Sequence, residues 1–146
     1  MRWVTRARPK TDRIACPWLI RRFIDHDATF LFVAPPDVLA VALATDARSF
    51  DAPGAQYGHR GDQCTFEVLI DEFHLHDDPA LERLAHVVHA ADVAGQRESD
   101  PLGAGLEAIG LGGLDVEEDD YQLLERATFV YDALYAWCAR AVTPSA

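Results

Sequence analysis

The residues best suited to chemistry include two polar side chains of the segment PALERLAHVVHAADVAG, which has the apolar spacing of a helix. At about 100° per residue, Leu81, Leu84 and Val88 form one apolar stripe, and Asp92 returns to within about 20° of it. An unpaired carboxylate facing a core is costly, so Asp92 needs a cation, a hydrogen-bond donor or a metal. His89 lies on the neighbouring ridge, and the pair can present a nitrogen and an oxygen to one ion. The alternative is a His–Asp hydrogen bond that braces two helices.

Two further residues extend this pair to a candidate metal site. His59 lies in a glycine-rich loop, and Glu67 flanks an apolar stripe where a neighbouring helix would pack. The other histidines lack such a context and are interpreted as surface or loop residues: His26, His74, His76 and His86. We therefore predict a divalent transition metal, Zn²⁺, Mn²⁺ or Fe²⁺, with two nitrogen and two oxygen ligands and room for water or an oxyanion. The predicted ligands are His59, Glu67, His89 and Asp92.

Positive charge is concentrated at the start of the chain. Residues 1–22 hold seven of the 13 Lys and Arg residues and one acid, a net charge of +6, whereas the whole chain carries −11. An acidic chain should repel nucleic acid, while a local basic segment suits a doubly charged tetrahedral anion bound by guanidinium groups. The candidate anion ligands are Arg6, Arg8, Arg13, Arg21 and Arg22, with Lys10 beside them. The alternative is that they pair with the chain's own 24 acids, within the fold or across a dimer.

Cys16 is a candidate redox thiol. It precedes Pro17 at an expected helix start and has Arg13 nearby, and both helix-terminal N–H groups and arginines favour a thiolate. The alternative is a small buried hydrophobe, as free cysteines usually are. Cys64 and Cys138 fall in apolar helical segments, and three distant cysteines without a CxxC pair predict neither a disulfide framework nor a zinc ribbon.

The elements that must position these residues are mostly helical. Short strands are predicted at 2–8, 29–33 and 49–52. Helices are predicted over 37–44, 64–73, 79–95, 102–109 and 117–142, with another that is capped at Thr11 or Asp12 and has Pro17 in its first main turn. A chain of 146 residues, 49% hydrophobic and 25% charged, fits one domain over 1–146. We predict an α+β fold: a predominantly helical single domain with a small sheet formed by the N-terminal half.

Several classes of protein lack support in the sequence. GxGxxG, P-loop, GxSxG and HExxH motifs are absent, so dinucleotide-binding, NTP-binding, hydrolase and zincin functions are not indicated. No apolar run approaches the roughly 20 residues that cross a bilayer, and no signal-peptide apolar region follows the Arg-rich start. We expect a cytoplasmic protein without a membrane segment.

A set of motifs resembles one known family. WVTRARPKTDRIACPWLIRRFID, followed by FLFV, GHRGDQCTFE, HAAD and YDALYAWC, is similar to the C-terminal domain of the ChrB family of chromate resistance proteins, over nearly the whole chain. The resemblance implies a link to chromate, through sensing or regulation, and adds weight to the four predicted metal ligands. Longer family members carry a further region before this domain. Because this chain starts at the domain, we expect no nucleic-acid binding by itself.

These observations leave three candidate functions. The preferred one is a chromate-linked metal- and oxyanion-binding domain that senses or buffers without turnover. The second is a small metal-dependent, redox-active enzyme in which the N-terminal arginines or Cys16 handle the substrate. The third is an interaction module without metal, for which a homodimer is one candidate assembly. A metal with an open position facing a pocket would favour the enzyme over the sensor.

Overall fold

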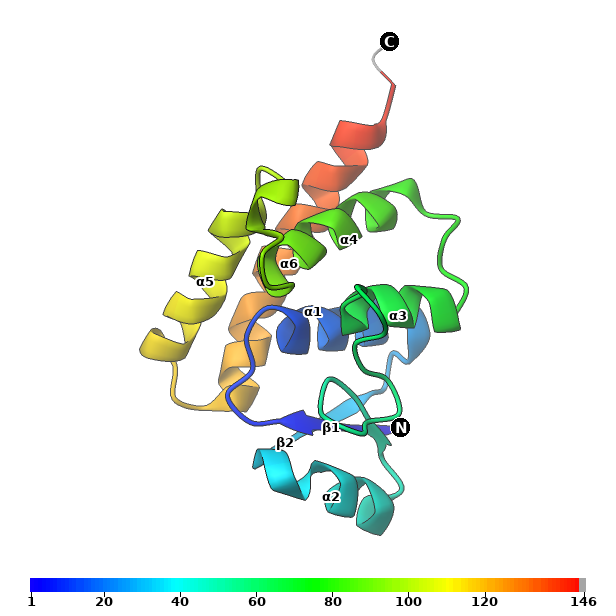
Figure 1. The fold of residues 1–146 in the computed structure, drawn as a ribbon, viewed down its shortest axis with the longest axis vertical. Helices are drawn as coiled ribbons and strands as arrows, with labels where there is room; N and C mark the ends of the chain where they lie inside the picture. Colours follow the sequence, from blue (N-terminus) through cyan, green and yellow to red (C-terminus); the bar gives the residue numbers. More distant parts are fainter. Residues whose placement is uncertain (145–146) are drawn as a thin grey trace.

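A small parallel sheet organises the computed structural model, which describes residues 1–144 (Figure 1). Its strands are β1 (Arg2–Arg6), β2 (Thr29–Val33) and β3 (Arg48–Ser49), in the order β2-β1-β3. The central strand is parallel to both neighbours, with Val4 in register with Leu31 and with Ser49. Trp3, Val4 and Thr5 are fully buried, because a parallel strand of this kind is covered on both faces.

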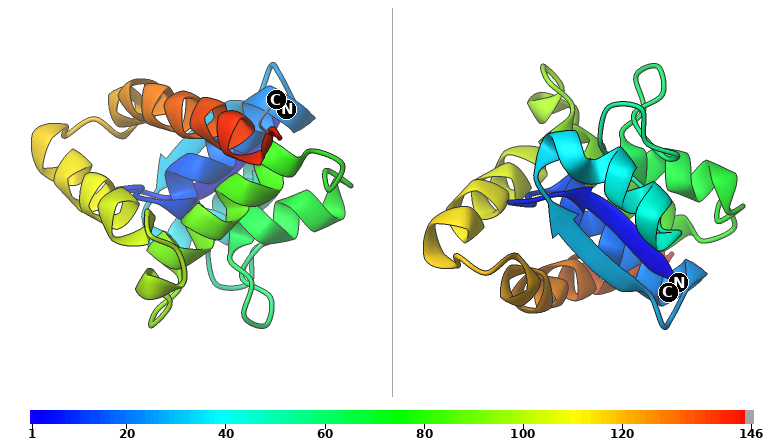
Figure 2. Two further views of the ribbon diagram at one scale, coloured as in Figure 1. Left: turned by 90° about the horizontal axis from the view of Figure 1, so that it is seen from above. Right: turned by 90° about the horizontal axis from the view of Figure 1, so that it is seen from below.

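Helices cover the two faces of the sheet unequally. The α-helices are α1 (Asp12–Leu19), α2 (Val38–Thr45), α3 (Thr65–Glu72), α4 (Pro79–Asp92), α5 (Gly103–Val116) and α6 (Asp120–Val142). Shorter helical segments are a π-helix at Ile20–Ile24 and 3₁₀ turns at Pro35–Asp37 and Arg97–Ser99. Helix α2 lies on one face of the sheet, and α1 lies on the other, with α3 and α6 beside α1 and α4 beyond it (Figures 1 and 2). Among the described residues, no helix is both long and apolar enough to cross a membrane.

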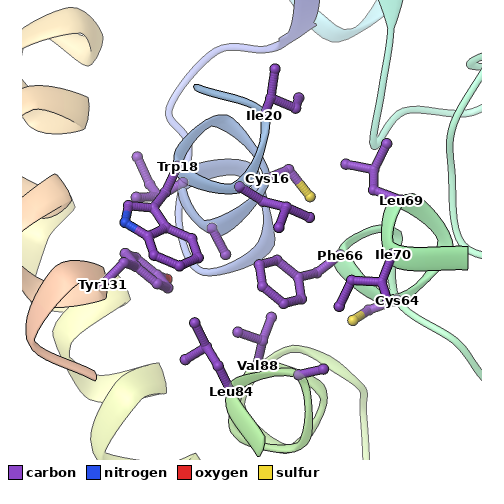
Figure 3. Packing of buried hydrophobic residues seen from close by; sticks show 14 of the residues in the cluster. Cys16, Trp18, Ile20, Cys64, Phe66, Leu69, Ile70, Leu84, Val88 and Tyr131 are labelled. Carbon is purple, nitrogen blue, oxygen red and sulfur yellow. The ribbon is translucent and has the colours of Figure 1, made fainter. Parts of the chain in front are cut away.

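The hydrophobic core lies between α1, α3, α4 and α6. The fully buried ring of Phe66 from α3 lies between α1 and α4, near Leu84 and Val88 (Figure 3). On the other side, the rings of Trp18 in α1 and Tyr131 in α6 have centroids 6.4 Å apart. Each large side chain buried in this way contributes about 1.5–3 kcal/mol. This packing fixes α1 against α3 and α4, each of which contributes to the site described below.

The predicted α+β class is confirmed, but some element boundaries were wrong. The first helix begins at Asp12, because the Thr11 carbonyl already accepts the N–H groups of Ile14 and Ala15. Pro17 therefore lies inside the helix and not in its first turn. The strand predicted over 49–52 ends at Ser49, before Asp51 adopts a left-handed backbone with φ of 49°.

The helix predicted to end at 109 continues to Val116. Its glycines at 110, 112 and 113 lower intrinsic helix propensity, and tertiary packing outweighs that preference here. Tight contacts of α5 with its neighbours show the packing: a Cβ added at Gly103 would lie 2.7 Å from the Cβ of Ala90 in α4.

Candidate functional site

Asp12 is the buried centre of a cluster of polar side chains. It is the first residue of α1 and is fully inaccessible to solvent. Its carboxylate accepts the N–H groups of Thr65 at 2.8 Å and Phe66 at 3.0 Å, which are the first two residues of α3. The Cys16 thiol also donates to it, at 3.4 Å. Burial raises the pKa of Asp12, and the charge of nearby Asp51 adds to this effect.

Asp51 approaches the same point from the end of the sheet. It follows β3, and its carboxylate accepts a hydrogen bond from the Thr65 hydroxyl at 2.9 Å. Arg6 and Arg13 each place a guanidinium nitrogen 3.5 Å from its other oxygen. Burial acts to raise the pKa of Asp51, but contacts with His59, Thr65 and Arg6 outweigh it and hold the pKa below its ordinary value.

His59 brings the carboxylates together. Its Nε2 atom lies 3.2 Å from Asp92 Oδ2, 3.3 Å from Asp51 Oδ1 and 3.5 Å from Asp12 Oδ2. The side chain belongs to the glycine-rich loop and remains 47% exposed, whereas the carboxylates it meets are largely buried. Interaction first with Asp12 and then with Asp51 raises the pKa of His59 to about 10. The imidazole is therefore positively charged at neutral pH when no metal is bound.

Asp92 completes the cluster at the last residue of α4. As the helical stripe predicted, it faces inward, and its side chain is 19% exposed. Burial raises its pKa to about 7, with repulsion from Asp12 and Asp51 as further causes. Three carboxylates thus meet one imidazole nitrogen, a density of negative charge that a single proton on His59 only partly offsets.

The cluster lies between two pockets. The first has a volume of about 530 Å³ and is lined by Asp51, His59 and both Arg6 and Arg60. The second, of about 420 Å³, is lined by Asp92 and by Lys10. An ion or small molecule can therefore reach the cluster without unfolding of the core.

The four predicted metal ligands divide between two groups. His59 and Asp92 belong to the cluster with Asp12, whereas Glu67 and His89 lie together beside Cys64. Glu67 Oε1 accepts the Cys64 N–H at 3.0 Å and lies 2.6 Å from His89 Nδ1. Glu67 thus forms a capping box at the start of α3 and links α3 to α4 through His89. His89 thus braces two helices, but its partner is Glu67 and not Asp92, and the role of Glu67 and His89 as metal ligands stays a prediction.

The five candidate anion ligands all have acidic partners within the fold. Arg6 and Arg13 pair with Asp51, Arg8 with Asp120, Arg21 with Glu125 and Arg22 with Asp132. They do not converge on one point. Arg22 also lies over the rings of Trp18 and Tyr135, which assigns it to α1–α6 packing. Of the five, only Arg6 lines the first pocket beside His59.

The candidate thiol Cys16 is fully buried. Burial raises its pKa well above the ordinary value, and the charge of Asp12 adds to this effect. The group is therefore a neutral thiol that donates to Asp12, which favours the structural interpretation over the redox one. Cys64 and Cys138 are buried free cysteines, as the sequence predicts.

Asp12 and Asp51 are the site residues that sequence reasoning missed. Both follow neighbouring parallel strands, β1 and β3, at the edge where the carboxyl ends of strands often bind ligands. The available signal was an acid placed shortly after each strand segment. Asp12 also suits a helix cap, however, and Asp51 falls within the strand predicted over 49–52, so neither residue is distinctive in the sequence alone.

The fold and the cluster define a small α+β domain with a histidine–carboxylate centre at the edge of a parallel sheet. A family model described as "ChrB, C-terminal domain" matches residues 3–138, so the chain belongs to the ChrB C-terminal domain family. Protein ChrB of Cupriavidus metallidurans is 41% identical over 133 residues, which cover 91% of this chain. The match spans only 39% of that relative's length. No solved structure gives a significant match.

Proposed function

We propose that this domain binds one divalent transition metal between Asp12, Asp51, His59 and Asp92, and that it serves sensing or regulation in chromate resistance. Family membership supports the chromate link. The observation that carries the metal proposal is the approach of one His59 nitrogen to oxygens of three separate carboxylates, at 3.2–3.5 Å.

Asp12, His59 and Asp92 each offer a ligand atom within 4.8 Å of the others, a spacing that fits one ion, and Asp51 approaches the same His59 nitrogen at 3.3 Å. Ligand atoms bound at about 2.1 Å lie about 3.0 Å apart in octahedral geometry and about 3.4 Å apart in tetrahedral geometry. The distances from His59 Nε2 to the carboxylate oxygens fall at or close to this range. A cation would also neutralise the repulsion that raises the pKa of Asp92. One nitrogen with several hard oxygens suits Zn²⁺, Mn²⁺ or Fe²⁺.

The same pocket supports oxyanion binding. Arg6 and Arg60 line it beside His59, each also paired with a carboxylate, Asp51 and Glu72 respectively, and a bound divalent ion would add positive charge to the pocket. A small tetrahedral dianion such as chromate would match this charge and could take an open position on the metal. We therefore propose that the oxyanion binds to the metal and to the arginines of this pocket, and not to the basic segment as a whole.

Binding without turnover is the proposed mode of action. Cys16 is buried, neutral and engaged with Asp12, so it is poorly placed to donate electrons to an oxidising anion. A metal-dependent enzyme is the second candidate, because His59 is half exposed toward a pocket and an ion there would keep an open position. Homodimer assembly and a cytoplasmic location stay predictions.

Metal titration of purified, metal-stripped protein tests the proposal. We expect one Mn²⁺ or Zn²⁺ per chain in the wild type, and a loss of at least about 100-fold in affinity for His59→Ala and for Asp92→Asn, each of which removes a ligand. His86→Ala changes an exposed histidine of the same α4 and is the matched control. Equal stoichiometric binding by the wild type and both ligand variants would refute the site.

Calorimetry of the oxyanion separates the second part of the proposal from the first. Chromate or sulfate should bind the metal-loaded wild type, bind more weakly to Arg60→Ala, and weaken with added salt because exposed charges are screened within about 8 Å at physiological ionic strength. Identical anion binding with and without metal would show that the metal does not take part. Chromate consumed over many turnovers would favour the enzyme.

A further inference from the structure

We infer that α5 positions Asp12 for metal binding through the contact of Gly110 with Thr11, although neither residue reaches the metal cluster. The inference rests on the proposed function and adds residues that would tune the affinity of that site. It starts from the backbone immediately before Asp12. Thr11 has φ of 46° and ψ of −103°, a conformation that a β-branched residue rarely adopts. Such a conformation persists only where the surroundings hold it, and it occurs often at functional sites.

Two helices, α5 and α6, hold Thr11 in place. The Tyr131 hydroxyl of α6 donates to the Thr11 carbonyl at 3.0 Å. Helix α5 approaches so closely that a Cβ added at Gly110 would lie 2.9 Å from Thr11 Oγ1 and 3.3 Å from Thr11 N. Any larger residue at 110 must therefore move Thr11 or the helix.

The segment before Thr11 is held by the same part of the fold. Arg8 has a left-handed backbone with φ of 57°. Its guanidinium donates to the carbonyls of Leu114 at 2.7 Å and Glu117 at 3.0 Å, at the end of α5, and it pairs with Asp120 at the start of α6. Residues 8–11 therefore form a strap between α5 and α6, and Asp12 is the next residue along the chain.

Asp12 transmits the position of this strap to the cluster. Its two oxygens are already fixed by the N–H groups of Thr65 and Phe66, so it has little freedom to compensate for a moved backbone. A displacement of Thr11 would change the distance from Asp12 to His59, now 3.5 Å. Gly110, Thr11 and Tyr131 are thus positioning residues, and groups of this kind typically change metal affinity about 10- to 100-fold when altered.

Titration with Co²⁺ tests the coupling, since the visible spectrum of bound Co²⁺ reports ligand geometry as well as affinity. We expect Gly110→Ala to weaken Co²⁺ binding about 10- to 100-fold and to alter the spectrum. Gly112→Ala, on the same helix with nothing within 4 Å of an added Cβ, should bind as the wild type does. Val38→Ala removes buried volume from α2 and controls for a general loss of stability.

A rescue variant and a pair of tyrosine variants complete the experiment. Thr11→Ala removes the hydroxyl oxygen that a Cβ added at Gly110 would meet, so the double variant should return to within about threefold of the wild-type affinity. If Gly110→Ala does not fold, Tyr131→Phe should still weaken binding, whereas Tyr135→Phe, which loses a bond to Asp78, should not. Equal affinity and spectra for Gly110→Ala and Gly112→Ala, or for the two tyrosine variants, would overturn the coupling. Absence of Co²⁺ binding by the wild type would instead overturn the proposed function.

Discussion

Two histidines meet carboxylates near the start of α3, yet their surroundings differ. His89 faces one carboxylate, Glu67, which also accepts the Cys64 N–H and caps the helix. His59 faces three carboxylates from different segments, and its pKa is raised to about 10. The first arrangement is a local brace between α3 and α4. The second gathers three carboxylates around one nitrogen beside a pocket, with Arg6 and Arg13 also close to Asp51, and such a convergence of ligand atoms suits a cation.

The pH dependence of metal binding should separate the two groups most strongly. Metal must displace the proton on His59, so affinity should rise about tenfold per pH unit from pH 7 toward the His59 pKa of about 10. Below about pH 7 the slope should steepen, because Asp92 also carries a proton there. Mn²⁺ titrations across this range measure the slope. It should persist in His89→Ala, and a flat profile in the wild type would contradict the role given to His59.

Removal of Asp12 should lower the stability of the domain more than removal of Glu67. Asp12→Ala leaves two buried N–H groups of α3 without an acceptor and should cost about 2–4 kcal/mol in the free energy of unfolding. The substitution also removes the repulsion between Asp12 and the carboxylates of Asp51 and Asp92, and this gain offsets part of the cost of the lost hydrogen bonds. Glu67→Ala removes one half of a capping box and should cost about 1 kcal/mol. Urea unfolding of the metal-free variants measures both losses of stability. Equal losses for Asp12→Ala and Glu67→Ala would contradict the view that Asp12 is the buried centre of the cluster and Glu67 only a local brace.

His89→Ala tests the brace directly. It breaks the link between α3 and α4 and should cost about 1 kcal/mol of stability. Metal affinity should stay within about threefold of the wild type, since His89 lies in the other group. Chemical denaturation and metal titration of one preparation give both values. Loss of metal binding in this variant would restore His89 as a ligand, as the sequence predicts.

The smallest effect concerns the metal-free domain. His59 has a folded-state pKa of about 10 against 6.5 for the free side chain, so its contribution to stability is fully present below pH 6.5 and is lost as pH rises toward 10. The raised pKa of Asp92 changes the free energy of unfolding between pH 3.8 and about pH 7, which is mostly below the pH range in which His59 titrates. Because His59 is half exposed, the slope should be shallow. Thermal unfolding at several pH values should show the decline in the wild type and a weaker one in His59→Ala.

The sequence predicted the inward orientation of Asp92 because that orientation depends only on helical periodicity. The predicted set of ligands included His59 with Asp92, but the sequence could not separate this pair from Glu67 and His89, because the path of the loop that carries His59 depends on tertiary contacts. Asp12 and Asp51 were missed for a related reason. Asp12 and Asp51 meet only because β1 and β3 pair in parallel, and the pairing of such short strands cannot be predicted from local sequence patterns.

Charge counting left two interpretations of the basic segment open, and the ion pairs within the fold favour the second, in which the arginines pair with the chain's own acids. The arginines of this segment are close in sequence, but their acidic partners come from distant parts of the chain, such as Glu125 and Asp132 in α6. A local excess of positive charge therefore indicated packing of the N-terminal helix against the C-terminal one. The fold class was easier to predict, because helix content follows from many independent periodic segments.

The four cluster residues come from widely separated positions, between residue 12 and residue 92. An ion held by all four would act as a cross-link that joins the end of the sheet, the glycine-rich loop and the last turn of α4. Unlike a disulfide, such a link would form only where the folded chain brings the ligands together, so the free energy of metal binding would add to the free energy of unfolding. Chelators would then lower the unfolding temperature of the whole domain, and that temperature would depend on the concentration of free metal.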